Sequence, residues 1–319
     1  MNSRVPRLVA LTPWFLLPAL SMAGPGSLEI NQACVADGCF PGDAGGFPVT
    51  VAASGSYSLT SNLLVPDENT HAIVVDAASV SIELNGFTIE GPVRCTGLED
   101  DCTPGGGSGV GILATSGSTN VSVSNGSIVG MGWKGLQLVG QSSIERMRVE
   151  HARRAAASLG VGGRVSQSAA NRNGYLGWEA TDARLIDVTA TGNGQAGINC
   201  ARCIVERATV HDNVGVGMFD GYGSIVTNSV FARNGIGVWS TNGGTRLLAN
   251  QFVYNNGLGF FAQPAVPPDI PDSETQVSTL SGNSFIENNG GNHADQIGGS
   301  GGLWVELDAN LCGLSTTCP

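Results

Sequence analysis

The most constraining feature of the sequence is a repeat of about twenty residues that ends in an Asn-Gly turn or a close variant. The turn residues follow one another at intervals of 20, 20, 21 and 22 residues. They are Asn173, Asn193, Asn213, Asn234 and Asn256. A fixed period in this range is typical of stacked supersecondary units, each of which completes its core against its neighbours. A stack offers a long lateral surface more readily than a deep pocket, so the period also constrains the function.

Within each repeat, short alternating apolar runs separated by Gly and Asn predict strands rather than helices. Alignment of the repeats predicts three inward-facing columns. The first contains Glu145, Val165, Leu185, Val205, Val226 and Leu248. The second contains Val149, Ala169, Thr189, Thr209, Val230 and Phe252. The third, after the turn, contains Leu136, Ile198, Met218, Val238 and Phe260. Equivalent strands of successive coils should pair in parallel, and parallel crossovers are right-handed. The predicted fold class is therefore all-β, a right-handed parallel β-helix (solenoid) with N- and C-terminal disulfide caps.

The first residues have the pattern of a secretory signal peptide. Arg4 and Arg7 precede the apolar run 8–20, and Ser21-Met22-Ala23 has the small residues of a cleavage site. Since this run is too short to cross a bilayer, we expect a secreted or periplasmic mature chain without a membrane span. The expected divisions are 1–23 for the signal peptide, 24–69 for an N-terminal cap, 70–310 for the β-helix and 311–319 for a C-terminal disulfide loop.

Eight cysteines fall into four pairs that are local in sequence, and an even count in an exported protein suggests disulfides. The preferred pairing is Cys34 with Cys39, Cys95 with Cys102, Cys200 with Cys203, and Cys312 with Cys318. Other connectivities stay open at this point. The Cys-x-x-Cys spacing of the third pair also occurs in redox and metal motifs, but no second such pair or neighbouring His accompanies it. We predict no metal site and no cofactor.

The charge of the chain argues against nucleic acid as a partner. The sequence has 15 basic and 26 acidic residues, and removal of Arg4 and Arg7 leaves 13 against 26, a net charge of −13. Such a surface repels phosphate backbones. An anionic glycan would likewise need a local basic patch, and the neighbourhood of Arg172, Arg207 and Arg233 is the one candidate.

The repeats, among them IVTNSVFARNGIGVWS and LLANQFVYNNGLGFF, resemble the right-handed β-helix superfamily of pectate lyases and polygalacturonases. Within it they are most similar to generic exported β-helix repeat proteins, over roughly residues 70–310. The resemblance implies the fold but not one activity, because this superfamily includes lyases, hydrolases, esterases, epimerases, adhesins and accessory proteins. The Asn-x-Asp and Gly-His-Gly signatures of polygalacturonases do not occur in this sequence.

One outward-facing column is a candidate ligand-binding site. It contains Glu179, Asn199, Phe219, Trp239 and Phe261, each beside an inward position. A row of exposed aromatic rings could stack on the faces of sugar rings, with Trp239 as the main anchor. The alternative interpretation is that the Pro-rich segment 263–280 folds back over the rings.

A second candidate is the cluster of His211, Asp212 and Arg233 at the turn edge, in which the first two could move a proton and Arg233 could hold a carboxylate. A solvated turn edge would contain the same residues. Whether the protein is an enzyme stays open. The first hypothesis is an exported protein that binds polysaccharide or another extended surface ligand through its lateral face. The alternatives are a divergent polysaccharide lyase or glycoside hydrolase, and a structural or adhesive surface module.

Overall fold

The computed structural model describes residues 26–98, 101–263, 277–292, 295–299 and 304–313, together with Ser315 and Cys318. The predicted signal peptide lies outside the described residues. So does most of the segment expected to cover the aromatic column, residues 264–276.

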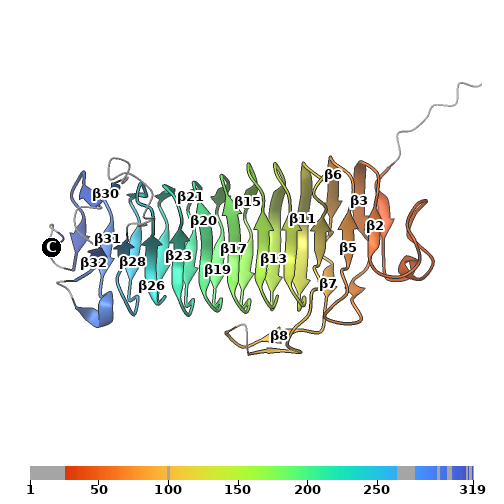
Figure 1. Cartoon of the computed structure of the whole chain (residues 1–319), viewed down its shortest axis with the longest axis horizontal. Coiled ribbons are helices and arrows are strands. Elements are labelled where there is room, and N and C mark those ends of the chain that lie inside the picture. Colours follow the sequence, from red (N-terminus) through yellow and green to blue (C-terminus); the bar gives the residue numbers. More distant parts are fainter. Residues whose placement is uncertain are drawn as a thin grey trace, which may run out of the picture.

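The chain winds into an elongated stack of coils whose strands pair in parallel from one coil to the next (Figure 1). One sheet, which we call the third row, runs the length of the stack. Its eleven described strands are β2 (Val49–Val51), β5 (Ile73–Val75), β10 (Ile112–Ala114), β12 (Lys134–Leu138), β14 (Ala155–Leu159), β17 (Leu176–Thr181), β20 (Ala196–Ala201), β23 (Val216–Asp220), β26 (Ile236–Ser240), β29 (Phe260–Ala262) and β32 (Ile297–Gly299).

A second sheet divides lengthwise into a first and a second row. The first row contains β1 (Leu28–Ile30), β3 (Gly55–Leu59), β6 (Val80–Glu83), β15 (Arg164–Ser166), β18 (Arg184–Ile186), β21 (Ile204–Glu206), β24 (Ile225–Thr227), β27 (Arg246–Leu248), β30 (Ser278–Ser281) and β33 (Trp304–Glu306). The second row contains β4 (Leu63–Leu64), β7 (Thr88–Glu90), β16 (Ala169–Asn171), β19 (Thr189–Thr191), β22 (Thr209–His211), β25 (Val230–Ala232), β28 (Gln251–Val253), β31 (Ser284–Ile286) and β34 (Leu311–Cys312). Two long strands, β11 (Val121–Val129) and β13 (Ser143–Glu150), contribute to both rows.

The remaining described elements are two short 3-10 helices and one hairpin. They are η1 (Cys34–Ala36), η4 (Asn289–Gly291), β8 (Arg94–Cys95) and β9 (Cys102–Thr103). The predicted all-β parallel β-helix with disulfides near both ends is thus confirmed. The parallel pairings begin at β1 with Leu28, within the segment that we expected to be only a cap.

The third inward column was predicted correctly, since all five of its side chains are fully buried. The first column is wrong at its two ends. Leu248 is half-buried, and Leu247 is the residue that aligns with Val226 in the core. Glu145 is also half-exposed, and its neighbour Ile144 aligns with Val165 instead.

The second inward column is displaced by one residue over most of its length. Ala169, Thr189, Thr209 and Val230 face outward, and the buried positions are those of Ala170, Ala190, Val210 and Phe231. A shift of one residue moves a strand side chain to the opposite face. The cause is a single left-handed residue at each corner, such as Asp187 with φ of 55°, which resets the alternation between one row and the next.

Buried asparagines connect successive coils where the second row turns into the third. Asn213 accepts hydrogen bonds from the backbone N and from Nδ2 of Asn193, at 3.0 and 2.9 Å, and its own Nδ2 donates to Oδ1 of Asn234 at 2.9 Å. The ladder consists of Asn173, Asn193, Asn213, Asn234, Asn255 and Asn288, and ends on Gln296. The predicted Asn256 is exposed, and Asn255 occupies the ladder position because it follows the core residue Phe252 at the same distance in sequence as Asn234 follows Phe231.

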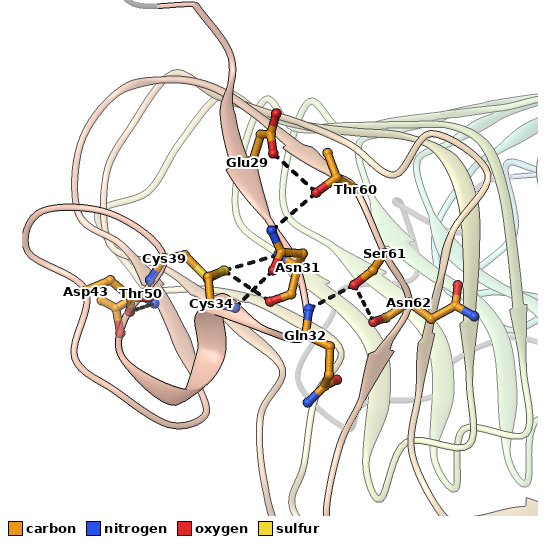
Figure 2. The surroundings of a disulfide bond; sticks show 10 residues. All are labelled: Glu29, Asn31, Gln32, Cys34, Cys39, Asp43, Thr50, Thr60, Ser61 and Asn62. Carbon is orange, nitrogen blue, oxygen red and sulfur yellow. Dashed lines mark hydrogen bonds between the residues drawn. A yellow bond between two sulfur atoms is a disulfide. The ribbon is translucent and has the colours of Figure 1, made fainter.

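Both ends of the chain carry small disulfide loops, and the structure contains all four sequence-local bonds. Figure 2 shows how the loop closed by Cys34 and Cys39 is attached to the first coils. Asp43 accepts hydrogen bonds from the backbone N of Cys39 and of Thr50, each at 2.8 Å. Gln32 donates its backbone N–H to Oγ of Ser61 at 2.8 Å.

The loop that contains β8 and β9 lies along the side of the stack, below the coils in Figure 1. Two histidines tie it to the coils through Nδ1. Nδ1 of His151 lies 3.0 Å from the backbone O and 3.3 Å from the backbone N of Cys95, and the backbone N of Val110 donates to Nδ1 of His71 at 3.0 Å. Burial lowers the pKa of both imidazoles below their ordinary value of 6.5.

We predict that Asn213→Ala lowers the free energy of unfolding by about 2–4 kcal/mol, because two donors of Asn193 lose their acceptor in the interior. Urea denaturation followed by fluorescence measures the change. The matched control is Asn256→Ala, at an exposed position outside the ladder, which should stay within about 0.5 kcal/mol of the parent. Equal effects of the two substitutions would contradict the ladder as a source of stability.

We also predict that acid loosens the attachment of the loop at His71. Because the folded state holds this imidazole neutral, the stability contributed by its bond to Val110 is present above pH 6.5 and is lost as the pH falls below 6.5 through the lowered pKa of the folded imidazole. The protection factor of the Val110 amide against hydrogen exchange should fall over this range, while that of Ile112, within β10, stays constant. A Val110 amide whose protection is independent of pH would refute this assignment.

Candidate functional site

The third row places the predicted ligand-binding residues in one line. Strand pairing aligns Glu179 with Asn199, Asn199 with Phe219, Phe219 with Trp239, and Trp239 with Phe261. All five side chains are half-buried on the outer face. Each coil therefore contributes one residue to a column that runs along the axis of the stack.

The three aromatic rings of this column are in contact and tilted against one another. The centroid of Trp239 lies 5.7 Å from the centroid of Phe219 and 5.7 Å from that of Phe261, with interplanar angles of 70° and 63°. The Nε1 atom of Trp239 is buried and has no hydrogen-bond partner among the described residues. The rings, rather than the indole N–H, are thus the part of the column available to a ligand.

An apolar cluster separate from the main core lies beside this column on the same outer face. Its buried members are Ala155, Leu176, Ala196 and Val216, and Tyr175, Phe219, Ile236 and Trp239 pack against them. The first four residues align across β14, β17, β20 and β23. The aromatic column is therefore the edge of a broader apolar strip.

At the opposite end of the strip, Glu179 is joined by charged and aromatic groups that the sequence analysis did not identify as part of the site. The guanidinium of Arg154 lies 4.1 Å from the ring centroid of Tyr175 and 5.5 Å from that of Trp133. Nζ of Lys134 lies 2.7 Å from Oε2 of Glu179, which places this ion pair across the intervening strand β14. Coil-to-coil alignment, extended from β17 toward the N-terminus by two coils to β12, gives the positions of these residues but not their side-chain contacts.

The structure also brings His211, Asp212 and Arg233 together, on the second row and its corner rather than on the third row. Nδ1 of His211 lies 2.6 Å from Oδ2 of Asp212, and its Nε2 lies 3.0 Å from Oγ1 of Thr191. Arg233 binds both carboxylate oxygens of Asp212, at 2.7 and 2.8 Å. The Arg233 guanidinium, with a smaller contribution from His211, lowers the pKa of Asp212 to about 2.

The same Asp–Arg geometry occurs at the other two corners of the coil. In each case an Asp and the Arg one coil later both have left-handed backbones, with φ between 51° and 57°, and form a bidentate pair. The three pairs are Asp182 with Arg202, Asp187 with Arg207, and Asp212 with Arg233. This recurrence indicates that the Asp212–Arg233 pair connects coils, whatever His211 does beside it.

Neither a metal centre nor a membrane helix emerges from the described part of the chain. The described residues contain no group of three or more His, Cys, Asp or Glu side chains with a geometry that could hold a metal ion. None of the helices within the described ranges is long and apolar enough to cross a membrane.

Comparison with known proteins shows similarity of fold at low sequence identity. No family model matches the chain, and no curated protein matches its sequence. A double mutant of the periplasmic alginate epimerase AlgG superposes with a TM-score of 0.62 at 12% identity, over 91% of this chain and 84% of the epimerase. A single mutant of the same epimerase gives 0.61 at 13%, over 90% and 84%. The Dettilon tailspike protein gives 0.51 at 14%, over 76% of this chain and 56% of the tailspike. The likeness is one of fold, that of the parallel β-helix proteins.

We predict that Asp212 titrates with a pKa of about 2 and that Arg233→Gln raises this pKa toward the ordinary value of 3.8, because the guanidinium no longer stabilises the carboxylate. Carbon-13 NMR of the Asp212 carboxyl group follows the titration. Arg202→Gln, which removes the equivalent cation at another corner, should leave Asp212 unchanged. A wild-type Asp212 that titrates near 3.8 would show that the pair does not form in solution.

Proposed function

We propose that this protein binds a polysaccharide along the outer face of the third row, with Glu179, Asn199, Phe219, Trp239 and Phe261 as the contact residues. The observation that carries the proposal is their alignment, one residue per coil, beside an apolar strip. Aromatic rings stack on the C–H faces of sugars, and a column parallel to the axis suits a linear polymer. Coils repeat about every 4.7–4.9 Å, a step similar to the advance of one sugar along a glycan chain.

The fold comparison supports the same class of ligand. By its name, the epimerase with the similar fold acts on alginate, which is a polysaccharide. Fold alone does not determine function, so this likeness adds support only because an aligned aromatic column is present on the surface. Four disulfides in 319 residues further support export to an oxidising compartment, the periplasm or the medium.

A catalytic role on polysaccharide is the second candidate, and the hydrogen-bonded pair of His211 and Asp212 is the observation that favours it. A carboxylate that orients an imidazole is a common arrangement for a general base. Against this, Arg233 occupies both oxygens of Asp212, and His211 lies on a different row from the aromatic column. If the protein is a lyase or hydrolase, His211→Ala abolishes turnover and preserves binding. If it only binds, no polysaccharide is cleaved by the parent.

We predict that Trp239→Ala weakens polysaccharide binding by at least about tenfold, or about 1.4 kcal/mol, since it removes the central ring of the column. Affinity electrophoresis against a panel of polysaccharides identifies the ligand, and calorimetry measures the loss. Tyr254→Ala is the matched control, because Tyr254 is an exposed aromatic residue at a corner outside the third row. Circular dichroism should show unchanged strand content in both variants. Equal affinity of the Trp239 variant and the parent would remove the column from the binding site.

A further inference from the structure

The distribution of charge around the aromatic column identifies the class of glycan. We infer that the ligand is an uncharged polysaccharide rather than a uronate polymer. This inference rests on the proposed function and makes it more specific. It depends on which charges the outer face offers to a ligand and which are already neutralised within the protein.

The first step is the composition of the column and of its two flanks. On β17, β20, β23 and β26 one flank consists of Leu176, Ala196, Val216 and Ile236, and the other consists of Thr181, Ala201, Gly221 and Thr241. None of these side chains is charged. The column itself contains one ionisable group, the carboxylate of Glu179. A uronate bound along this strip would therefore find no cation opposite its carboxylates.

The second step concerns Lys134, the one lysine in the sequence. Its ammonium group is within 2.7 Å of Glu179, and its side chain is only 14% exposed. The pair neutralises both charges at the polar end of the column. Asn199, between this pair and the rings, remains as an uncharged hydrogen-bonding group suited to sugar hydroxyls.

The third step concerns the arginines that could have formed a basic patch. Arg207 and Arg233 are held in bidentate pairs with Asp187 and Asp212, respectively, at corners of the coil. Arg172 lies at the end of the second row, at the same corner as Asp212, and not on the third row. Arg154 is stacked between Trp133 and Tyr175 at the far end of the strip, away from the three rings. The mature chain would carry a net charge of −13, so an anionic polymer would also meet long-range repulsion. Uncharged pyranose rings need no cation opposite them and are not repelled by the net negative charge.

The test compares uncharged hexasaccharides, such as those of β-linked glucose, mannose and N-acetylglucosamine, with uronate hexasaccharides of the same length. Calorimetry on the full mature chain at low ionic strength should give binding to at least one uncharged hexamer. Every uronate hexamer should bind at least about tenfold more weakly, with a smaller difference at high salt because salt screens the repulsion. A uronate that binds as tightly as the best uncharged hexamer, through Trp239, would overturn the inference and leave the proposed function intact. Failure of all hexamers to bind would overturn the proposed function itself.

Charge variants of the column test the same inference from the protein side. Glu179→Gln leaves the Lys134 ammonium unpaired beside the column and should raise uronate affinity about tenfold relative to the affinity for the uncharged ligand. Asn199→Lys adds a cation at the adjacent coil and should act in the same direction even if the first variant folds poorly. Glu206→Gln, which removes a carboxylate on β21 in the first row, is the matched control and should change neither affinity. Uronate affinity that is indifferent to both column variants would contradict the inference.

Discussion

The whole structure depends on the hydrogen bonding that fixes one coil above the next. Parallel strand pairing supplies most of these bonds, and the buried asparagine ladder supplies the ones that strands cannot, at the corner where the chain turns from the second row into the third. Each ladder amide satisfies backbone and side-chain groups of its neighbour in the interior, where an unpaired polar group would be costly. A coil cannot shift along the stack without breaking several such bonds at once.

The alignment of side chains in columns on the outer face follows from this fixed register. Each coil contributes one residue to each column, so residues at equivalent positions of successive repeats become neighbours on the surface. The line of Phe219, Trp239 and Phe261 arises in this way, and so do the Asp–Arg pairs at the three corners. The corner pairs are largely exposed and individually weak, so their main effect is to neutralise arginines that would otherwise be available to an anionic ligand.

The sequence was sufficient for the fold and for the aromatic column. The Asn-Gly period locates the turns to within one residue, and the third-row core positions follow four or five residues later, so Met218 and Val238 were assigned correctly to the core and Phe219 and Trp239 to one outward line. The inward positions predicted for the second row were displaced by one residue. The left-handed residue at each corner resets the alternation of side chains, and its identity varies from coil to coil.

The Lys134–Glu179 pair and the stacking of Arg154 could not be predicted from spacing. They depend on side-chain reach across coils rather than on backbone register. Likewise, His211, Asp212 and Arg233 were correctly expected to be neighbours, but only the three corners seen together show that the Asp–Arg pair recurs.

The most direct test of this account is a crystal structure of the protein bound to an uncharged hexasaccharide that it recognises. The account predicts sugar rings along β20, β23, β26 and β29, with successive pyranoses over Phe219, Trp239 and Phe261 and hydroxyl groups within hydrogen-bonding distance of Asn199. Density for the glycan on the first or second row, for example beside His211, would contradict it.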